Sequence, residues 1–313
     1  MSATSSRRNF GIAQWWDAIR RDRKAGMGAA VLAVFAFIAV LGPLLVGDPQ
    51  ALVGIPLQAP SLHHLLGTTG QGQDVLAQLI VGTRVSLLIG FGVGLAVVLI
   101  GAMVGVTAGF YGGRIDALLS LLFNVFLVIP GLPLAIVIAA YLPTGSFTLA
   151  LVLIIAGWAW NARVIRAQTL SLRRRDFVAA AIVTGESDFR IILSEILPTM
   201  TSLLVAQVIG STIYAIGAQV GLEFLGLGDV SAVTWGTNLY WAQNDSALLT
   251  GAWWTFAPTG FCVALVGFGL SMLNSGFDEI SNPRLQLERA WREHLNRRGL
   301  KTARSTPVVR SHD

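Results

Sequence analysis

Residues 176–198 read DFVAAAIVTGESDFRIILSEILP, and this stretch lies between two long apolar segments of the chain. It belongs to a connection, 166–199, of about 34 residues, far longer than a turn between two neighbouring helices needs. The first part favours a short helix that ends at Gly185, because glycine accepts the left-handed conformation of a helix C-terminus. Ser187 or Asp188 can cap a second short helix, which we expect to end before Pro198. The pattern fits either a docking surface or a plain amphipathic connector.

The composition around this stretch is that of a membrane protein. Hydrophobic residues make up 54% of the 313 residues and charged residues only 12%, with a mean hydropathy of +0.65. A soluble domain has about 25% charged residues, so this chain has too little polar surface for a water-soluble globule. At about 20 residues per crossing, six stretches are long enough to span a bilayer as helices. They are 27–46, 85–110, 118–142, 147–165, 200–220 and 253–273.

The basic residues predict the orientation of these six helices. With an even number of crossings, both termini share one side with the 111–116 turn and the 166–199 connection. Counting Arg163 with that connection, every lysine and arginine except Arg84 falls on this side. The loops 47–84, 143–146 and 221–252 contain acidic residues instead, namely Asp48, Asp74, Glu223, Asp229 and Asp245. By the positive-inside rule this side is cytoplasmic. We therefore expect an all-α membrane protein of six transmembrane helices with both termini in the cytoplasm.

Three regions follow from this pattern. They are an N-terminal tail, 1–26, a six-helix transmembrane domain, 27–275, and a basic C-terminal tail, 276–313. Trp15 and Trp16, beside a basic cluster, predict an interfacial amphipathic helix in the N-terminal tail, in contact with membrane lipid. No small-residue cleavage pattern follows the first apolar run, so we interpret it as an uncleaved membrane helix.

The residues disfavour several classes of function. The net charge of +5 is explained by membrane topology, so we expect no nucleic-acid partner. The middle of each span has no ionisable residue, which argues against a carboxylate-relay transporter. Neither Lys24 nor Lys301 follows a glycine, so the phosphate-binding loop of an ATPase is missing. His63 and His64 lack a third ligand, which predicts no metal site. We expect no catalytic residue and no cofactor, and Cys262, as the single cysteine, allows no internal disulfide.

Small and polar residues within the spans predict packing and breaks. Glycines repeat every four residues in 90–94 and in 101–109, which predicts close approach of neighbouring helices. Pro130, Pro133 and Pro258 fall inside spans, where each should kink or open its helix. Five amides either line a pathway or bond a neighbouring helix, and they are Asn124, Asn161, Gln207, Gln219 and Asn274.

Short motifs in a fixed order resemble those of ABC importer permeases of the oligopeptide/dipeptide type, in particular the second, C-type permease. The small residues before Gly185 and the later ILP of 196–198 are similar to the EAA loop of that family. The other matching motifs are HLLGT (64–68), GQDVL (72–76), RVSLL (84–88), AGFYGG (108–113), IPG (129–131), GLEFLGLG (221–228), WG (235–236) and NPR (282–284). The resemblance covers about residues 60–285.

The resemblance implies a permease subunit in the inner membrane of a bacterium that forms half of the translocation pathway for oligopeptides or dipeptides. It implies a homologous second permease, two separate ATPase domains that bind ATP and Mg, and an extracytoplasmic solute-binding protein. The 166–199 connection is then the coupling loop between helices 4 and 5 that docks into the ATPase. Its expected docking residues are Asp176, Phe177, Ala179, Ala180, Ala181, Gly185, Glu186, Asp188, Phe189, Arg190 and Pro198. The expected residues facing the binding protein are Glu223, Asp229, Trp235, Tyr240 and Trp241.

The chain departs from the family pattern at three positions. Ala179 stands where the family has the glutamate of its Glu-Ala-Ala motif, which puts an acidic contact to the ATPase from that position in question. Thr69 and Gln73 stand where an aspartate and an arginine are usual, so contacts of that loop with a binding protein can differ.

Alternative functions remain at the level of sequence. The same architecture imports oligosaccharides or nickel complexes, and the chain carries no feature that separates these from peptides. A different class is a self-contained channel or secondary transporter, which would act without an ATPase. A membrane-embedded enzyme would need clustered acids or histidines, and no such cluster is evident.

Overall fold

The computed structural model describes residues 23–281, and helices build this part of the chain. The predicted N-terminal interfacial helix and the NPR motif lie outside the described residues. In chain order the helices are α2 (Arg23–Leu45), α3 (Val75–Tyr111), α4 (Gly113–Val128), α5 (Gly131–Tyr141), α6 (Ser146–Arg173), α7 (Asp176–Val183), α8 (Asp188–Ile191), the π-helix η1 (Ile192–Ile196), α9 (Leu197–Thr199), α10 (Thr201–Phe224), α11 (Trp235–Asn244), α12 (Ala247–Thr250), the 3-10 helix η2 (Trp253–Thr255) and α13 (Ala257–Ser281).

Several of these helices are long and apolar enough to cross a membrane. Within residues 23–281 there are five such segments, namely α2, α3, α6, α10 and the stretch Trp253–Ser275 that contains most of α13. α4 and α5 pass the same test only as a pair, and they are bent by 83° at a short break. The all-α prediction is confirmed for the described residues, which contain six candidate membrane spans when the bent pair counts as one.

The break between α4 and α5 is produced by Pro130. Ile129 has extended backbone angles (φ −83°, ψ 125°), as expected for a residue that precedes a proline. The predicted interruption is therefore confirmed at this position and is sharper than a kink. Pro133 and Pro258 lie in the first turns of α5 and α13, where the missing N–H is not needed. The prediction that these two prolines kink their helices is wrong.

The bundle is built around the contact of α3 with α6 and α10. A Cβ atom added to Gly101 would lie 2.6 Å from the Cβ of Asn161, and one added to Gly109 would lie 2.7 Å from the Cβ of Thr169, both on α6. Gly94 meets Thr212 of α10 in the same way. The prediction that the glycine stripes serve close helix packing is confirmed.

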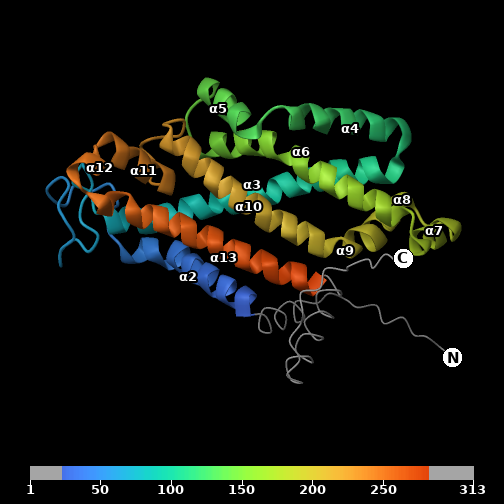
Figure 1. Ribbon diagram of the computed structural model, residues 1–313, viewed down its shortest axis with the longest axis horizontal. Helices are drawn as coiled ribbons and strands as arrows, with labels where there is room; N and C mark the ends of the chain where they lie inside the picture. The colour runs from blue at the N-terminus through green and yellow to red at the C-terminus, as the bar shows by residue number, and fades with distance from the viewer. Residues whose placement is uncertain (1–22, 282–313) are drawn as a thin grey trace, which may run out of the picture.

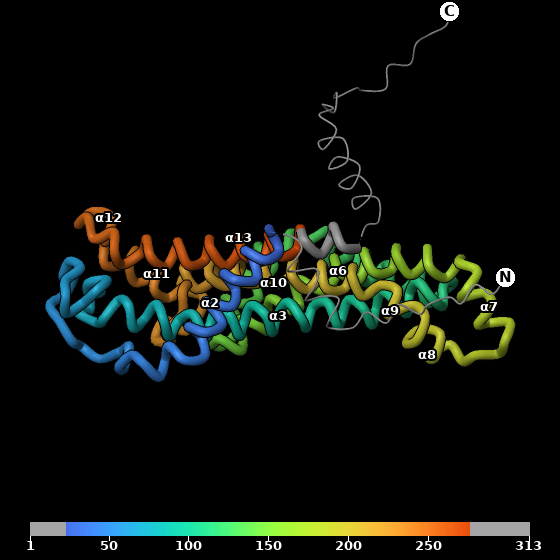
Figure 2. Tube along the Cα trace, turned by 90° about the horizontal axis from the view of Figure 1, so that it is seen from below, coloured from blue at the N-terminus to red at the C-terminus, as the bar shows by residue number. Residues whose placement is uncertain are grey.

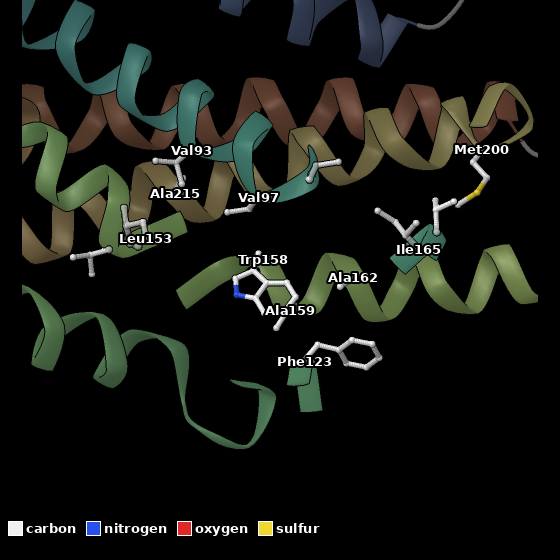
Figure 3. Packing of buried hydrophobic residues seen from close by; sticks show 14 of the residues in the cluster. Val93, Val97, Phe123, Leu153, Trp158, Ala159, Ala162, Ile165, Met200 and Ala215 are labelled. Atoms are coloured by element: carbon white, nitrogen blue, oxygen red, sulfur yellow. The ribbon is translucent and has the colours of Figure 1, made fainter. Parts of the chain in front are cut away.

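Apolar side chains fill the space between these helices. Figure 3 shows Trp158 and Ala162 of α6, with Phe123 of α4 on one side and Val97 of α3 on the other, all within one buried cluster. Phe126 of α4 packs edge-on against Trp158, with 5.3 Å between ring centroids. These contacts hold α4 against the bundle up to the helix break at Pro130.

The described part of the molecule is long and flat, with loops at two opposite ends (Figures 1 and 2). We call them the α7 end, with α7 and α8, and the α11 end, with α11, α12 and the 47–74 loop. α2 and α13 follow one long edge, and α4 and α5 follow the other (Figure 1). α3 has 37 residues, or about 55 Å at 1.5 Å per residue, so it extends well beyond a hydrocarbon layer of about 30 Å.

Candidate functional site

The α7 end contains the two short helices predicted from residues 176–198. α7 ends in a glycine turn, in which Gly185 has a φ of +80°. The N–H of Gly185 donates to the carbonyl of Ile182 (3.0 Å), and the N–H of Glu186 donates to that of Ala181 (3.1 Å). This pair of bonds is the Schellman motif, so the prediction that Gly185 breaks the two helices is confirmed. Ser187 occupies the N-cap of α8 without a side-chain capping bond.

Four large apolar side chains at this end are exposed, and we call them the α7 surface: Phe177, Ile182, Val183 and Phe189. Val183 is 87% and Phe189 72% exposed. The three arginines just before α7, 173–175, are exposed as well, so this end meets water or headgroups rather than lipid tails. Exposed apolar patches of this kind are typical of surfaces that contact another protein or a membrane.

The opposite side of α7 and α8 is anchored in the bundle. Val178, Ile191, Ile196 and Met200 have no exposed surface and belong to the same buried cluster as the α3–α6 contact. The hydroxyl of Thr169 on α6 approaches the sulfur of Met200 (3.8 Å). The α7 surface is therefore held by packing on α6, so force applied to it reaches the bundle.

The charged residues in and between α7 and α8 either stand at the start of a helix or form a local ion pair. Asp176 and Asp188 begin α7 and α8, where a carboxylate interacts favourably with the helix dipole. Glu186 forms an i,i+4 ion pair with Arg190 (3.7 Å). Ala179 and Ala180 are exposed, so the position at which the resembling family has glutamate faces outward.

The second short helix continues through Pro198 instead of ending before it. α8, η1, α9 and α10 follow one another with only Met200 between the last two. The π turn is closed by the N–H of Leu197, which donates to the carbonyl of Ile192. A proline ring clashes with the carbonyl of the residue four positions earlier, and widening the preceding turn to a π-helix accommodates it. The predicted stop before Pro198 is wrong, and Pro198 is exposed at the start of a continued helix.

An ion pair joins α4 to α6 near the α7 end. The guanidinium of Arg166 donates two hydrogen bonds to the carboxylate of Asp116, the one from Nη2 being 2.6 Å long. This pair was not predicted from the sequence, because Asp116 and Arg166 both lie outside the predicted spans. The only available signal was that each of these charged residues lies within one helical turn of a predicted span boundary.

At the α11 end, two residues expected to face a binding protein are buried. Glu223 is 2% exposed and Trp235 fully buried. Thr234 donates from its hydroxyl to Glu223 Oε2 (2.6 Å), and Gln219 donates from Nε2 to Oε1 (3.1 Å). The backbone N–H of Trp235 donates to the hydroxyl of Ser86 (3.1 Å). Both residues thus shape the loop from inside, and the expectation that their side chains contact a partner is corrected.

The other three predicted residues lie at the surface of the α11 end. Asp229 accepts hydrogen bonds from the hydroxyl (2.6 Å) and backbone N–H (2.9 Å) of Ser231, which hold the pKa of its carboxyl below the usual value. Tyr240 and Trp241 form an edge-on ring pair, 5.3 Å between centroids. Trp241 also donates from Nε1 to the carbonyl of Val230 (2.9 Å).

Two exposed leucines next to these residues were missed by the sequence analysis. Leu248 and Leu249 on α12 are 78% and 90% exposed. Two adjacent leucines in a loop of small and polar residues were a readable signal of a contact surface.

A cavity of about 490 Å³ lies in the middle of the bundle, between α3, the α4–α5 break, α6 and α10. Two of the five amides, Asn161 and Gln207, line it. Asn161 donates to the hydroxyl of Ser211 on α10 (3.1 Å), so it both lines the cavity and bonds a neighbouring helix. Gln219 instead bonds to Glu223, and Asn124 is exposed on α4.

Similarity to known proteins identifies the family of the chain. Residues 98–286 match the family described as "Binding-protein-dependent transport system inner membrane component". The chain is 30% identical to the dipeptide transport system permease protein DppC of Bacillus subtilis, over 87% of this chain and 85% of that protein. It is 32% identical to a putative peptide transport system permease of Brucella abortus (86% and 91%), and 29% identical to the oligopeptide permease OppC of Bacillus subtilis (88% and 91%). The chain therefore belongs to the inner membrane components of binding-protein-dependent ABC transport systems, as a permease subunit.

Proposed function

We propose that this chain is the C-type permease of a peptide importer in the inner membrane of a bacterium. It pairs with a homologous permease, two ATPase domains and an extracytoplasmic solute-binding protein. The names of the relatives, which include dipeptide and oligopeptide permeases, support peptides over oligosaccharides or nickel complexes. The regions 1–26, 27–275 and 276–313 serve as the N-terminal tail, the transmembrane domain and the C-terminal tail.

The observation that carries the proposal is the α7 surface and its attachment to the bundle. Four exposed apolar side chains, Phe177 among them, stand at the tip of two short helices. α8 continues into α10 through η1 and α9, and α7 and α8 pack on α6. Both α6 and α10 line the cavity. In this proposal the α7 end lies in the cytoplasm, and an ATPase that grips the α7 surface tilts α6 and α10 as it opens and closes.

The α11 end then faces outward and receives the solute-binding protein. Asp229, Tyr240 and Trp241 supply a charge and aromatic rings at its surface, and Leu248 and Leu249 add apolar area. Aromatic residues of this kind are enriched in protein interfaces.

The test is co-purification of the assembled importer in mild detergent. Val183→Glu combined with Phe189→Glu places two charges in the α7 surface and should release the ATPase while the partner permease stays bound. Because both side chains are exposed, the change leaves the bundle core intact.

The matched control carries the same charges at the other end. Leu248→Glu with Leu249→Glu should keep the ATPase and weaken the binding protein instead. Retention of the ATPase by the α7-surface variant would reject the docking assignment. Recovery of the wild-type chain alone, with solute flux in the absence of any ATPase, would favour the self-contained channel or carrier.

A further inference from the structure

One face of α6 carries polar and charged side chains that the described part of the chain leaves uncovered. Trp160, Arg163, Ala167, Gln168 and Ser171 recur at intervals of one to four residues, as one face of a helix requires, and all five are exposed. A charged side chain facing lipid tails is costly, and such residues in membrane helices face a bundle interior or a water-filled cavity. This face is therefore directed to something other than lipid.

Hollows follow this face along its length. The central cavity of about 490 Å³ has Trp160 and Asn161 in its lining. A second hollow of about 520 Å³ is lined by Trp160, Arg163 and Gln168 of α6 and by Leu203. A third, of about 500 Å³, is lined by Ser171 and Arg174 among others. In this order they follow α6 from the central cavity toward the α7 end.

Arg163 is the charged residue among the side chains that line the first two hollows. Within residues 23–281 it forms no ion pair. Arg166, nearly one turn further along α6, is in contrast held by Asp116. Around the central cavity the polar groups are neutral, and the amide Nε2 of Gln207 there is buried without a hydrogen-bond partner. The first two hollows thus offer one cation, Arg163, and no acidic side chain that would neutralise it.

The long edge formed by α2 and α13 has a different surface from this face of α6. The exposed side chains of α2 and α13 include Phe37, Val40, Leu44 and Phe268, and this edge is the apolar one expected against lipid. This contrast supports a solute pathway along the α6 face rather than along the α2–α13 edge.

We infer that this face of α6 lines the α7-end half of the translocation pathway, and that Arg163 binds the carboxylate of the transported solute there. The inference rests on the proposed function, since a peptide carries a C-terminal carboxylate. A guanidinium binds a carboxylate through two parallel hydrogen bonds. Arg163 is thus a specificity-determining residue, which favours solutes with a free carboxylate over those without one.

The first test measures the exposure of this face to water in the assembled importer. Cys262 is the single cysteine of the chain, so Cys262→Ala gives a clean background for Arg163→Cys and Gln168→Cys. Both should react at least roughly tenfold faster with a membrane-impermeant thiol reagent than the lipid-edge control Phe268→Cys. A transported dipeptide should slow the reaction of Gln168→Cys. Labelling no faster than the control, or labelling of Gln168→Cys that the dipeptide leaves unchanged, would overturn the inference.

The second test separates a carboxylate contact from a structural role. Proteoliposomes with the complete importer take up a dipeptide or its C-terminal amide, and each variant is compared with wild type for each solute. Arg163→Gln should lower uptake of the acid about tenfold, the scale of one hydrogen bond to a charged group, and leave the amide unchanged. Arg163→Lys keeps the charge but loses the paired hydrogen-bond geometry, so uptake of the acid should fall less than in Arg163→Gln.

The outcomes distinguish this inference from the proposed function. Equal loss for acid and amide, or no loss for either, overturns the role of Arg163 while wild-type peptide uptake still stands. Failure of the wild-type importer to move any peptide rejects the proposed function itself, and the thiol labelling then still reports whether the α6 face meets water.

Discussion

Replacing Gly185 by valine isolates the contribution of the turn between α7 and α8. Gly185 has a φ of +80°, and no atom lies within 4 Å of the place where a Cβ would stand. Steric conflict with neighbours is therefore absent, and the whole cost comes from the backbone. A non-glycine residue in the left-handed region costs about 1–2 kcal/mol of conformational free energy, and for a β-branched residue the cost is at or above the upper value.

A strain of about 2 kcal/mol changes the ratio of two conformations by roughly 30-fold, since 1.36 kcal/mol is tenfold. The strained state retains the Gly185–Ile182 and Glu186–Ala181 hydrogen bonds, and the relaxed state gives them up. Val178 and Ile191 stay packed in the bundle, so the chain should still fold and assemble. The angle between α7 and α8 should change, and with it the fit of the α7 surface to the ATPase.

The assay is ATP-driven peptide uptake by proteoliposomes, with ATP hydrolysis and subunit content measured on the same sample. We expect Gly185→Val to lower uptake about tenfold or more while the subunits remain together. Gly185→Asn is the matched control, because asparagine tolerates the left-handed region better than other residues, and it should keep most of the uptake. Full uptake by Gly185→Val, or equal losses for both variants, would refute the argument that this turn transmits force.

Two further predictions concern the stability of the bundle, measured as thermal unfolding in detergent. Gly105→Leu forces a side chain against Ile165 and the backbone of Arg166 and should lower the stability of the bundle by about 1–3 kcal/mol. The control Gly92→Leu, with no atom within 4 Å of the added Cβ, should leave the stability unchanged. Equal effects of the two variants would contradict the α3–α6 packing. Glu223→Ala leaves the donors of Thr234 and Gln219 without an acceptor and should cost about 1–3 kcal/mol per unsatisfied group, whereas Glu223→Gln keeps an acceptor and should cost less; an unchanged unfolding temperature for the alanine variant would contradict the buried network.

The features readable from the sequence were those set by local pattern. Long apolar runs, the glycine stripes and the break at Pro130 each follow from the chemistry of a few adjacent residues, and the structure bears them out. The start of α3 was not readable in this way. The helix begins at Val75, with Asp74 accepting from the N–H of Ala77 (2.9 Å), although Gln78 and Arg84 lower the apolar character of its first turns.

The features that sequence reasoning misplaced depend on contacts between distant segments. Glu223 was expected to face a binding protein because it falls in the loop 221–252, which the sequence places outside the membrane. It is buried because Thr234, eleven positions later, and Gln219, one turn earlier, satisfy its oxygens. Trp235 is buried by its packing against Phe35 of α2, with 6.0 Å between ring centroids, a contact that no local pattern announces.

The absence of ionisable residues from the middle of the predicted spans and the shape of the bundle both favour mechanical coupling over proton or ion coupling. α10 (Thr201–Phe224) follows the π turn at Ile192–Ile196 and the short α9, contributes Gln207 and Ser211 to the wall of the central cavity, and contains Glu223 in its last turn. Its 24 residues extend over about 36 Å at 1.5 Å per residue, with a packed anchor at each end and an open cavity between them. A rigid helix held in this way converts a small displacement at the α7 surface into a change in the width of the cavity. In the proposed mechanism this lever moves no proton or ion through the chain, and the energy enters at the α7 surface, where the ATPase docks.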